Sequence, residues 1–286
     1  MVVIALKVGF IGAGKVGVSL GKYFSINHKE ISGYYSRNIL SSKDAANFTG
    51  SNYYENIDTL VNESDIIFIT TPDDTIINIW NDIKDFYLTG KLICHSSGSL
   101  SSEIFSNINN SGAYGYSIHP MYAFSDKYNS YKNLNSAYFS IEGTFDALAS
   151  MRNFIESCGN NVLVLDSDKK NLYHLANVTV SNLMLSLMNV GCGFLAECGI
   201  SEEASIKALL PLIENNLENI VSKGFVNSLT GPIERCDLGT IKHHISELSA
   251  DNIILYKLLS FNLVELSEKK HMGRDYSFIK EYLKSL

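Results

Sequence analysis

A glycine-rich segment near the N-terminus has the spacing of a phosphate-binding turn. It reads GFIGAGKVGVSL, a G-x-G-x-x-G pattern that follows a short apolar run and opens a helix-compatible stretch. The first glycine of such a pattern permits a tight turn, the second lets the backbone approach a pyrophosphate, and the third lets helix pack on strand. The amides that open the helix then face the anion. We therefore predict a dinucleotide site formed by Gly12, Ala13, Gly14, Lys15, Val16 and Gly17.

The end of the next β-rich run indicates which dinucleotide is bound. An NAD site usually places Asp or Glu there, to accept a hydrogen bond from the ribose 2′-hydroxyl. Here the run ends in YYSRN, so Ser36, Arg37 and Asn38 supply no carboxylate. The Arg37 guanidinium can donate two hydrogen bonds to a 2′-phosphate, with Ser36 beside it. The predicted cofactor is NADP(H); the alternative is that Arg37 is only a solvated surface cation.

Small polar and imidazole side chains end three further β-rich runs. These residues are Thr71 and Pro72, Ser96 and Ser97, and His119. The carboxyl ends of parallel strands meet at one edge of a sheet, and open α/β sheets bind ligands there. We therefore expect these residues to lie around the cofactor. Asp73 or Asp74 is expected to cap the helix that follows Pro72.

Short β-rich runs alternate with helix-compatible segments in the first part of the chain. The runs cover residues 6–12, 30–36, 64–71, 90–97, 112–119, 136–143 and 161–166. Apolar runs that alternate with helices predict a parallel sheet covered on both faces. Only helical periodicity follows, over residues 168–198, 202–222, 237–249 and 251–270. The fold class is therefore α/β: a doubly wound Rossmann sheet over residues 1–166, then an all-helical domain over residues 167–286.

Composition and charge exclude several classes of function. The formal net charge of −7 leaves no basic stripe that would neutralise the phosphates of a nucleic acid. The five cysteines are scattered and form no CxxC pair, which indicates a reducing cytoplasm and no metal site. Residues 182–200 come closest to a membrane span, but Asn189 and Glu197 interrupt them. We expect a cytoplasmic protein without a nucleic acid, metal or membrane partner.

The first long helix of the second half carries a polar face. His174, Asn177 and Ser181 fall at positions i, i+3 and i+7 and therefore share one side of the helix. Reduction of a C=O or C=N bond needs a group that protonates the heteroatom, and histidine suits that role near neutral pH. His174 is the first choice for this proton donor and His119 the second. The alternative is a polar stripe that is satisfied within an interface.

The segment LTGPIERCDLGTIKHH, residues 229–244, is unusually rich in ionisable groups for a link between helices. Arg235 lies just before a predicted helix and can hold a carboxylate with two donors. Thr240 and His244 share a helix face with Asp237, which is itself expected to be the N-cap. Arg235, Thr240 and His244 are therefore candidates for binding a small anionic substrate.

These motifs together resemble a family of Rossmann-like proteins that are assigned as NADP oxidoreductases and carry a C-terminal helical domain of unknown function. The family lies near pyrroline-5-carboxylate reductase, ketopantoate reductase and the deazaflavin-dependent NADP reductases. The resemblance covers nearly the whole chain. It is carried by the glycine loop, HSSG at 95–98, HP at 119–120, YH at 173–174, SN at 181–182, LTGP at 229–232 and an Arg-x-Asp-x-x-Thr-x-x-x-His pattern at 235–244.

The resemblance implies an NADP-linked fold, a homodimer formed through the helical domain, and functional roles for His174 and Asn177. This chain departs from the family at two places. Cys236 stands where the family usually has glycine, and Asn177 lies in a helix that is usually rich in alanine.

The expected function is transfer of a hydride between NADP(H) and a small, anionic carbonyl or imine compound. One alternative is an NADP(H)-binding sensor or scaffold without catalysis. Related hydroxyacid dehydrogenases carry a catalytic lysine on the first long helix, whereas here Lys169 and Lys170 only precede the Tyr-His pair. The other alternative is an enzyme whose hydride partner is a deazaflavin.

Overall fold

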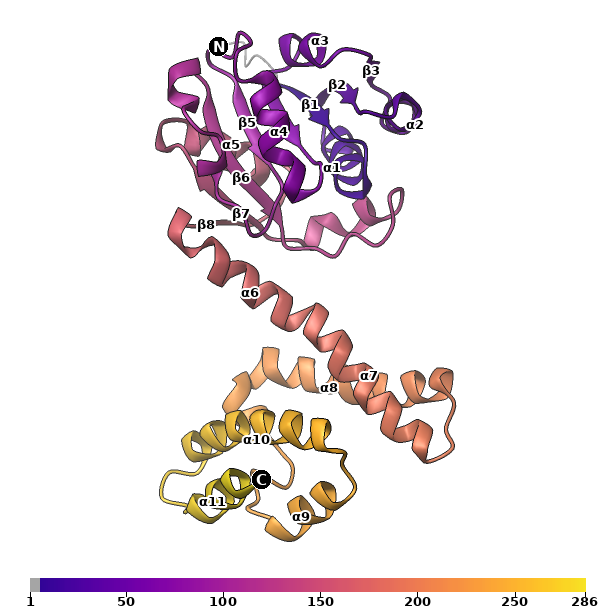
Figure 1. Ribbon diagram of the computed structural model, residues 1–286, viewed down its shortest axis with the longest axis vertical. Helices are drawn as coiled ribbons and strands as arrows, with labels where there is room; N and C mark the ends of the chain where they lie inside the picture. Colours follow the sequence, from indigo (N-terminus) through magenta and orange to yellow (C-terminus); the bar gives the residue numbers. More distant parts are fainter. Residues whose placement is uncertain (1–5) are drawn as a thin grey trace. The chain divides into compact units, whose positions relative to one another are not determined.

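The computed structural model describes residues 6–286. The chain divides into two compact units, Met1–Ser186 and Leu187–Leu286 (Figure 1). We predicted a boundary near residue 166, where the strands end. The compact units divide later because the helix that follows the last strand contacts the sheet.

The first unit contains one eight-stranded sheet in the order β3-β2-β1-β4-β5-β6-β7-β8. Its strands are β1 (Lys7–Ile11), β2 (Glu30–Tyr35), β3 (Asn52–Tyr54), β4 (Ile66–Ile69), β5 (Leu92–His95), β6 (Tyr114–Pro120), β7 (Phe139–Gly143) and β8 (Val162–Val164). This arrangement confirms the α/β class with a Rossmann-type sheet. The sheet is not wholly parallel, because β6 and β7 pair antiparallel. The link between them forms the 3₁₀ helix η3 (Ser130–Ser136) rather than the α-helical crossover that parallel strands need.

Helices cover both faces of this sheet, as Figure 1 shows. One face packs on α1 (Lys15–Ile26), α2 (Ile39–Thr49) and α5 (Leu148–Glu156). The other face packs on α3 (Ile57–Asn62) and α4 (Asp73–Ile83). Successive strand residues alternate between the two cores: Phe10 and Phe68 lie in the first, Ile11 and Ile69 in the second.

The second face changes from apolar to polar at β5. From β5 to β7, the residues between the core positions are His95, Ser117, His119, Ser140 and Glu142, which we call the polar layer. All are buried except His119, which is half-buried. The first turn of α6 (Lys170–Val180) contacts this layer, since the Tyr173 hydroxyl lies 2.7 Å from His119. Buried polar groups need partners, so this face differs from an ordinary core.

The second unit is helical. It holds most of α7 (Asn182–Glu197), followed by α8 (Glu202–Ser228), α9 (Leu238–Ser246), α10 (Ala250–Lys270) and α11 (Ser277–Ser285). The sequence pattern missed α11, which contributes Ile279 and Leu283 to a small core. Cys236 adopts a left-handed backbone conformation with φ of 60°. That conformation favours glycine, the residue that the related family usually carries there.

One helical stretch, Ser167–Glu197, is long and apolar enough by length and composition to cross a membrane. Its most apolar window has a mean hydropathy of 1.5 and is not buried. This differs from the expectation for residues 182–200, because the helical run begins earlier and gains apolar residues from α6. More than half of each of the following side chains is exposed: Leu172, Leu175, Val180, Leu183 and Leu185.

Candidate functional site

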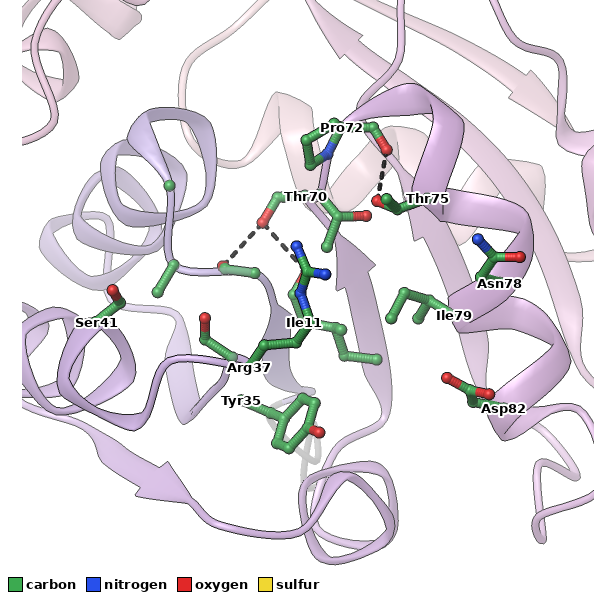
Figure 2. Close-up of a pocket in the computed structure, with 15 residues that line it drawn as sticks. Ile11, Tyr35, Arg37, Ser41, Thr70, Pro72, Thr75, Asn78, Ile79 and Asp82 are labelled. Carbon is green, nitrogen blue, oxygen red and sulfur yellow. Dashed lines mark hydrogen bonds between the residues drawn. The ribbon is translucent and has the colours of Figure 1, made fainter.

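A pocket of about 390 Å³ lies beside the glycine-rich turn in the first unit (Figure 2). It is lined by Ile11, Gly12, Ala13, Gly14, Tyr35, Ser36, Arg37, Ser41, Thr70, Thr71, Pro72, Thr75, Asn78, Ile79 and Asp82. Figure 2 shows Ser41 on one side and the α4 residues Asn78 and Asp82 on the other. The structure therefore brings together residues that follow β1, β2 and β4, at the sheet edge where ligands were expected.

The three glycines of the turn differ in what a Cβ atom at each position would contact. Gly12 has φ of 113°, and a Cβ there would lie 2.9 Å from the Thr70 carbonyl carbon. A Cβ on Gly17 would lie 2.4 Å from Thr70 Oγ1, so this glycine permits helix α1 to pack on the strands. A Cβ on Gly14 would meet nothing within 4 Å, so this position faces open space. The three glycines thus have the separate roles that a dinucleotide turn needs.

Two kinds of polar group beside this turn have no hydrogen-bond partner within residues 6–286, and a bound phosphate could provide one. Gly14 is the N-cap of α1, and no side chain accepts from the first amides of that helix. The Thr71 hydroxyl oxygen is buried and has no hydrogen-bond partner within residues 6–286. Free helix amides and an unpaired hydroxyl suit an anion. The pocket therefore fits a dinucleotide phosphate group.

The rim of the pocket at the end of β2 carries a cation and no carboxylate. Ser36 and Arg37 line it, and Arg37 has no salt-bridge partner within residues 6–286. Asn38 instead caps α2, its side chain accepting from the Leu40 amide at 3.0 Å. The pocket's carboxylate, Asp82, comes from α4, a position that no local sequence signal indicated.

Several residues predicted to bind the cofactor lie outside the pocket lining. They are Lys15, Val16, Gly17, Asn38, Ser96 and Ser97. Ser97 is buried and donates to Asp73 Oδ2 at 2.6 Å. The prediction that Asp73 or Asp74 caps α4 is wrong, because Pro72 is the N-cap and makes no side-chain cap. The Asp73 carboxylate instead joins α4 to the loop after β5.

Two histidines converge on Gly98. A Cβ at this position would lie 2.8 Å from His174 Cδ2 and 3.0 Å from His119 Nε2. Only glycine therefore lets both imidazoles approach the end of β5. Asn177 lies one turn further along α6, and its Nδ2 donates to the Tyr173 carbonyl oxygen at 2.8 Å. The predicted polar face ends there, because α6 stops at Val180 before Ser181.

His119 is held neutral at physiological pH. Burial, together with the nearby Lys170 and His174, lowers its pKa to about 4, whereas Asp73 acts against the shift. Its Nδ1 lies 2.7 Å from the Tyr173 hydroxyl. No hydrogen bond to its Nε2 is formed within residues 6–286, so this ring nitrogen is free for a ligand.

Lys170 lies close to His119 and Tyr173, although its place in the sequence predicted no role for it in the site. It is only 2% exposed, and within the part of the chain that the structure describes its ammonium makes one hydrogen bond, of 3.4 Å, to the Ser97 carbonyl oxygen. Burial lowers its pKa to about 8, although Glu142 and Asp73 partly oppose the shift. Glu142 does not pair with it directly, because its oxygens accept from the amide and hydroxyl of Ser102 at 2.7 and 2.6 Å. A buried cation without a carboxylate partner is unusual and marks a candidate functional group.

His95 has a structural place in the polar layer. The Ser97 amide donates to its Nδ1 at 3.3 Å, so its Nε2 must be the protonated nitrogen that donates to the Ser101 carbonyl at 3.2 Å. Burial lowers its pKa to about 4. Both ring nitrogens are therefore occupied by the loop after β5.

The three candidates for substrate binding lie in the second unit. Arg235 is exposed, whereas the Thr240 hydroxyl donates to Asp237 Oδ2 at 2.6 Å. Asp237 also accepts from the Thr240 amide and is the N-cap of α9, as predicted. His244 Nδ1 lies 3.0 Å from the Tyr256 hydroxyl. Of the three, only Arg235 has its polar atoms uncommitted inside this unit.

Glu234 accounts for part of the polarity of the segment 229–244. Its carboxylate contacts His271 and lies 3.6 Å from the Lys270 ammonium, while its carbonyl accepts from Tyr276 at 2.8 Å. These contacts fasten the segment to the end of α10 and the start of α11. Nowhere in residues 6–286 do three or more His, Cys, Asp or Glu side chains group as metal ligands would.

Comparison with known proteins assigns both parts of the chain. Residues 2–120 match the Rossmann-like domain, and residues 137–263 match a domain of unknown function, DUF2520. No curated protein sequence is significantly similar to the chain. These matches confirm the resemblance that the motifs carry.

Solved structures share the fold over nearly the full length. Protein TM1727 of Thermotoga maritima is 27% identical with a TM-score of 0.75, over 92% of this chain and 99% of that one. BF3122 of Bacteroides fragilis, assigned as an NADP oxidoreductase, is 22% identical with a TM-score of 0.73, over 91% and 98%. Pyrroline carboxylate reductase of Plasmodium falciparum, solved with NADP bound, is 17% identical with a TM-score of 0.62, over 94% and 98%. The chain thus matches a Rossmann-like domain over residues 2–120 and the DUF2520 domain over residues 137–263.

Proposed function

We propose that this protein is an NADP(H)-dependent oxidoreductase that acts on a small, anionic carbonyl or imine compound. The observation that carries the proposal is the pocket beside the glycine turn. Its phosphate end has free helix amides, and its β2 edge carries Arg37 without a neighbouring carboxylate. NADP(H) is therefore a better fit to this edge than NAD(H).

The structural likenesses support the same class of reaction. They include the pyrroline carboxylate reductase of Plasmodium falciparum with NADP and a reductive aminase of Aspergillus terreus with NADPH and ethyl-5-oxohexanoate. At 17% and 13% identity these proteins share the fold with this chain. By analogy with them, we propose a nicotinamide cofactor and a carbonyl or imine substrate for this chain.

A bound nicotinamide cofactor would supply or accept the hydride. The chain's own residues would hold and move the proton that accompanies it. His119 and His174 meet at Gly98, beside the carboxyl edge of the sheet, and both are candidates for this role. Arg235, with its exposed guanidinium, is the proposed anchor for a substrate carboxylate.

Fluorescence titration with NADPH and NADH tests the cofactor assignment. We expect the unmodified protein to bind NADPH at least about tenfold more tightly, since a charge-assisted hydrogen bond contributes about 1.5–3 kcal/mol. Arg37→Ala should weaken NADPH binding by about 10- to 100-fold on the same basis and leave NADH binding unchanged. Arg152→Ala, which removes an exposed guanidinium from α5, is the matched control. Equal affinity for both cofactors would overturn the 2′-phosphate assignment.

Catalysis is tested with a panel of small 2-oxo acids and cyclic imines, following NADPH absorbance. Oxidation of NADPH that depends on one of these compounds supports the enzyme. Tight NADPH binding without oxidation by any of them would support the sensor instead.

We also propose a cytoplasmic homodimer that covers the exposed apolar side chains of α6 and α7. Leu172, Leu175 and Val180 are each more than half exposed on α6, and large exposed apolar patches mark interaction sites. Sedimentation of the purified protein should give a dimer, and Leu175→Glu together with Val180→Glu should weaken it. A monomer that floats with lipid vesicles would contradict the proposal and favour a membrane partner.

A further inference from the structure

We propose that His119 and Tyr173 form a proton relay at the active site, with Lys170 as the cation behind it. In the direction of reduction, His119 Nε2 gives its proton to the reacting heteroatom, and Nδ1 takes the Tyr173 hydroxyl proton. This inference rests on the proposed oxidoreductase function and names the groups that would move the proton. It assigns Tyr173 and Lys170, which the sequence analysis did not.

The geometry of the pair is the first support for the relay. The Tyr173 hydroxyl lies 2.7 Å from Nδ1, a short hydrogen bond. Nε2 has no partner within residues 6–286 and lies 3.0 Å from the position of a Cβ on Gly98. A ring with Nδ1 accepting from Tyr173 must carry its proton on Nε2. In the proposed relay, His119 therefore presents its donor at the ring nitrogen that is free.

The electrostatic surroundings require that the proton be replaced as it leaves. The titratable groups around His119 are Lys170, Tyr173 and His174 of α6, His95 of β5 and Asp73 of α4. Burial and the neighbouring Lys170 depress its pKa to about 4, so the doubly protonated ring is not available near neutral pH. A single-proton imidazole is a weak acid unless a second group protonates its other nitrogen in the same event. Tyr173 is the group placed to do so.

Every proton that the relay moves comes from a residue of the chain or from water. The Nε2–H bond breaks and a heteroatom–H bond forms, while the Tyr173 O–H bond breaks and an Nδ1–H bond forms. His119 ends neutral in its other tautomer, and Tyr173 ends as a phenolate. His119 is half-buried, so once the product has left, Nε2 takes a proton from water while Nδ1 returns its proton to the phenolate, which restores the starting tautomer and the Tyr173 hydroxyl.

Lys170 is placed to stabilise the phenolate that the relay forms on Tyr173. Burial raises the pKa of Tyr173, which opposes loss of its proton. The Lys170 ammonium lies 5.2 Å from the centroid of the Tyr173 ring and has no salt-bridge partner within residues 6–286. An unpaired cation at this distance stabilises negative charge on the ring. Ser140, which pairs with His119 in the sheet, adds a fully buried hydroxyl that has no hydrogen-bond partner among the described residues.

The first test needs no substrate. In protein labelled with ¹⁵N-histidine, long-range ¹H–¹⁵N spectra report the tautomer and the pKa of His119. We expect the Nε2–H tautomer through neutral pH, a mixture of tautomers in Tyr173→Phe, and a pKa raised by about one unit or more in Lys170→Met. Lys169→Met is the matched control, since Lys169 is exposed and pairs with Asp168. An Nδ1–H tautomer, or a pKa unchanged in Lys170→Met, would overturn the relay.

The second test measures turnover of a cyclic imine by NADPH. Tyr173→Phe and His119→Gln should each lower kcat by about 10²- to 10⁴-fold while NADPH affinity is retained. A fall in His174→Gln with His119→Gln unaffected would move the donor to His174 and overturn the relay. Full turnover in Tyr173→Phe would overturn the relay and leave the oxidoreductase standing. If no compound of the panel oxidises NADPH, the oxidoreductase function itself fails, and the relay fails with it.

Discussion

The imidazole of His119 and the hydroxyl of Tyr173 lie 2.7 Å apart although 54 residues separate them in the chain. The first residue ends a strand of the sheet, and the second stands in the first turn of α6. Their rings meet edge to face, with an interplanar angle of 85°. This contact joins α6 to the carboxyl edge of the sheet, where the pocket beside the glycine turn also lies.

Two glycines of the turn should respond differently to alanine. Gly17→Ala should cost about 1–3 kcal/mol of unfolding free energy because its Cβ would lie 2.4 Å from Thr70 Oγ1. Gly14→Ala should cost less than about 1 kcal/mol, an N-cap preference, because a Cβ there meets nothing within 4 Å. Gly14→Ala should nevertheless reduce NADPH affinity, since the methyl group occupies the space of the pyrophosphate. Urea unfolding and NADPH titration of both variants check this; retained NADPH binding in a stable Gly14→Ala protein would contradict it.

Stability should fall as the pH drops from 6.5 to 4. The pKa of His119 and that of His95 both lie at about 4 in the fold, below the ordinary value of 6.5. Between these values the unfolded chain binds protons that the folded chain does not, so acid favours unfolding, by about 1.4 kcal/mol per pH unit for each histidine. His119→Gln removes one of the two contributions. Urea unfolding at several pH values should therefore give a shallower pH dependence for the variant; parallel curves would contradict the prediction.

Lys170 should lower the stability of the folded protein. Its pKa lies at about 8, below the ordinary 10.5, so stability should rise with pH between these values as the buried amine loses its proton. Lys170→Met should lack this rise and be more stable at neutral pH by about 1–2 kcal/mol, because a buried charge is replaced by an apolar group of similar length. Denaturant unfolding at neutral and alkaline pH measures both effects. A less stable Lys170→Met protein at neutral pH would mean that the ammonium holds the polar layer together.

Cys236→Gly should stabilise the second unit. Cys236 has φ of 60°, and a residue with a Cβ pays about 1 kcal/mol for this conformation. For a chain of this size the gain should raise Tm by about 2–4 °C. Cys236→Ala keeps the Cβ and is the control that should show no gain. A lower Tm for the glycine variant would indicate that the contact of Cys236 Sγ with the Asp275 carbonyl, at 3.8 Å, outweighs the strain.

The glycine turn and the rim at Arg37 could be predicted because their signals are local. A tight turn, a strand end and a helix start lie within a few neighbouring residues, so spacing alone places them. The three-residue strand β3 escaped prediction, since three residues are too few to show a clear period. Helix α11 was missed although Ile279 and Leu283 stand at the i, i+4 spacing of a helix. Asp82 escaped for another reason: it reaches the pocket from the third turn of α4, and nothing local relates it to the glycine turn.

Lys169 and Lys170 differ in burial, and only the tertiary structure decides this difference. They are identical neighbours in the sequence, and the pattern KKNLYH does not distinguish them. In the fold, the Lys169 side chain is 60% exposed and pairs with Asp168, whereas Lys170 is 2% exposed beside Tyr173 and Ser97. Residue spacing encodes backbone geometry and the alternation of strand faces, so the α/β fold and the glycine turn could be predicted from it. Burial, and with it the acidity of Lys170 and His119, depends on groups far apart in the chain, because desolvation is set by whatever packs around a charge.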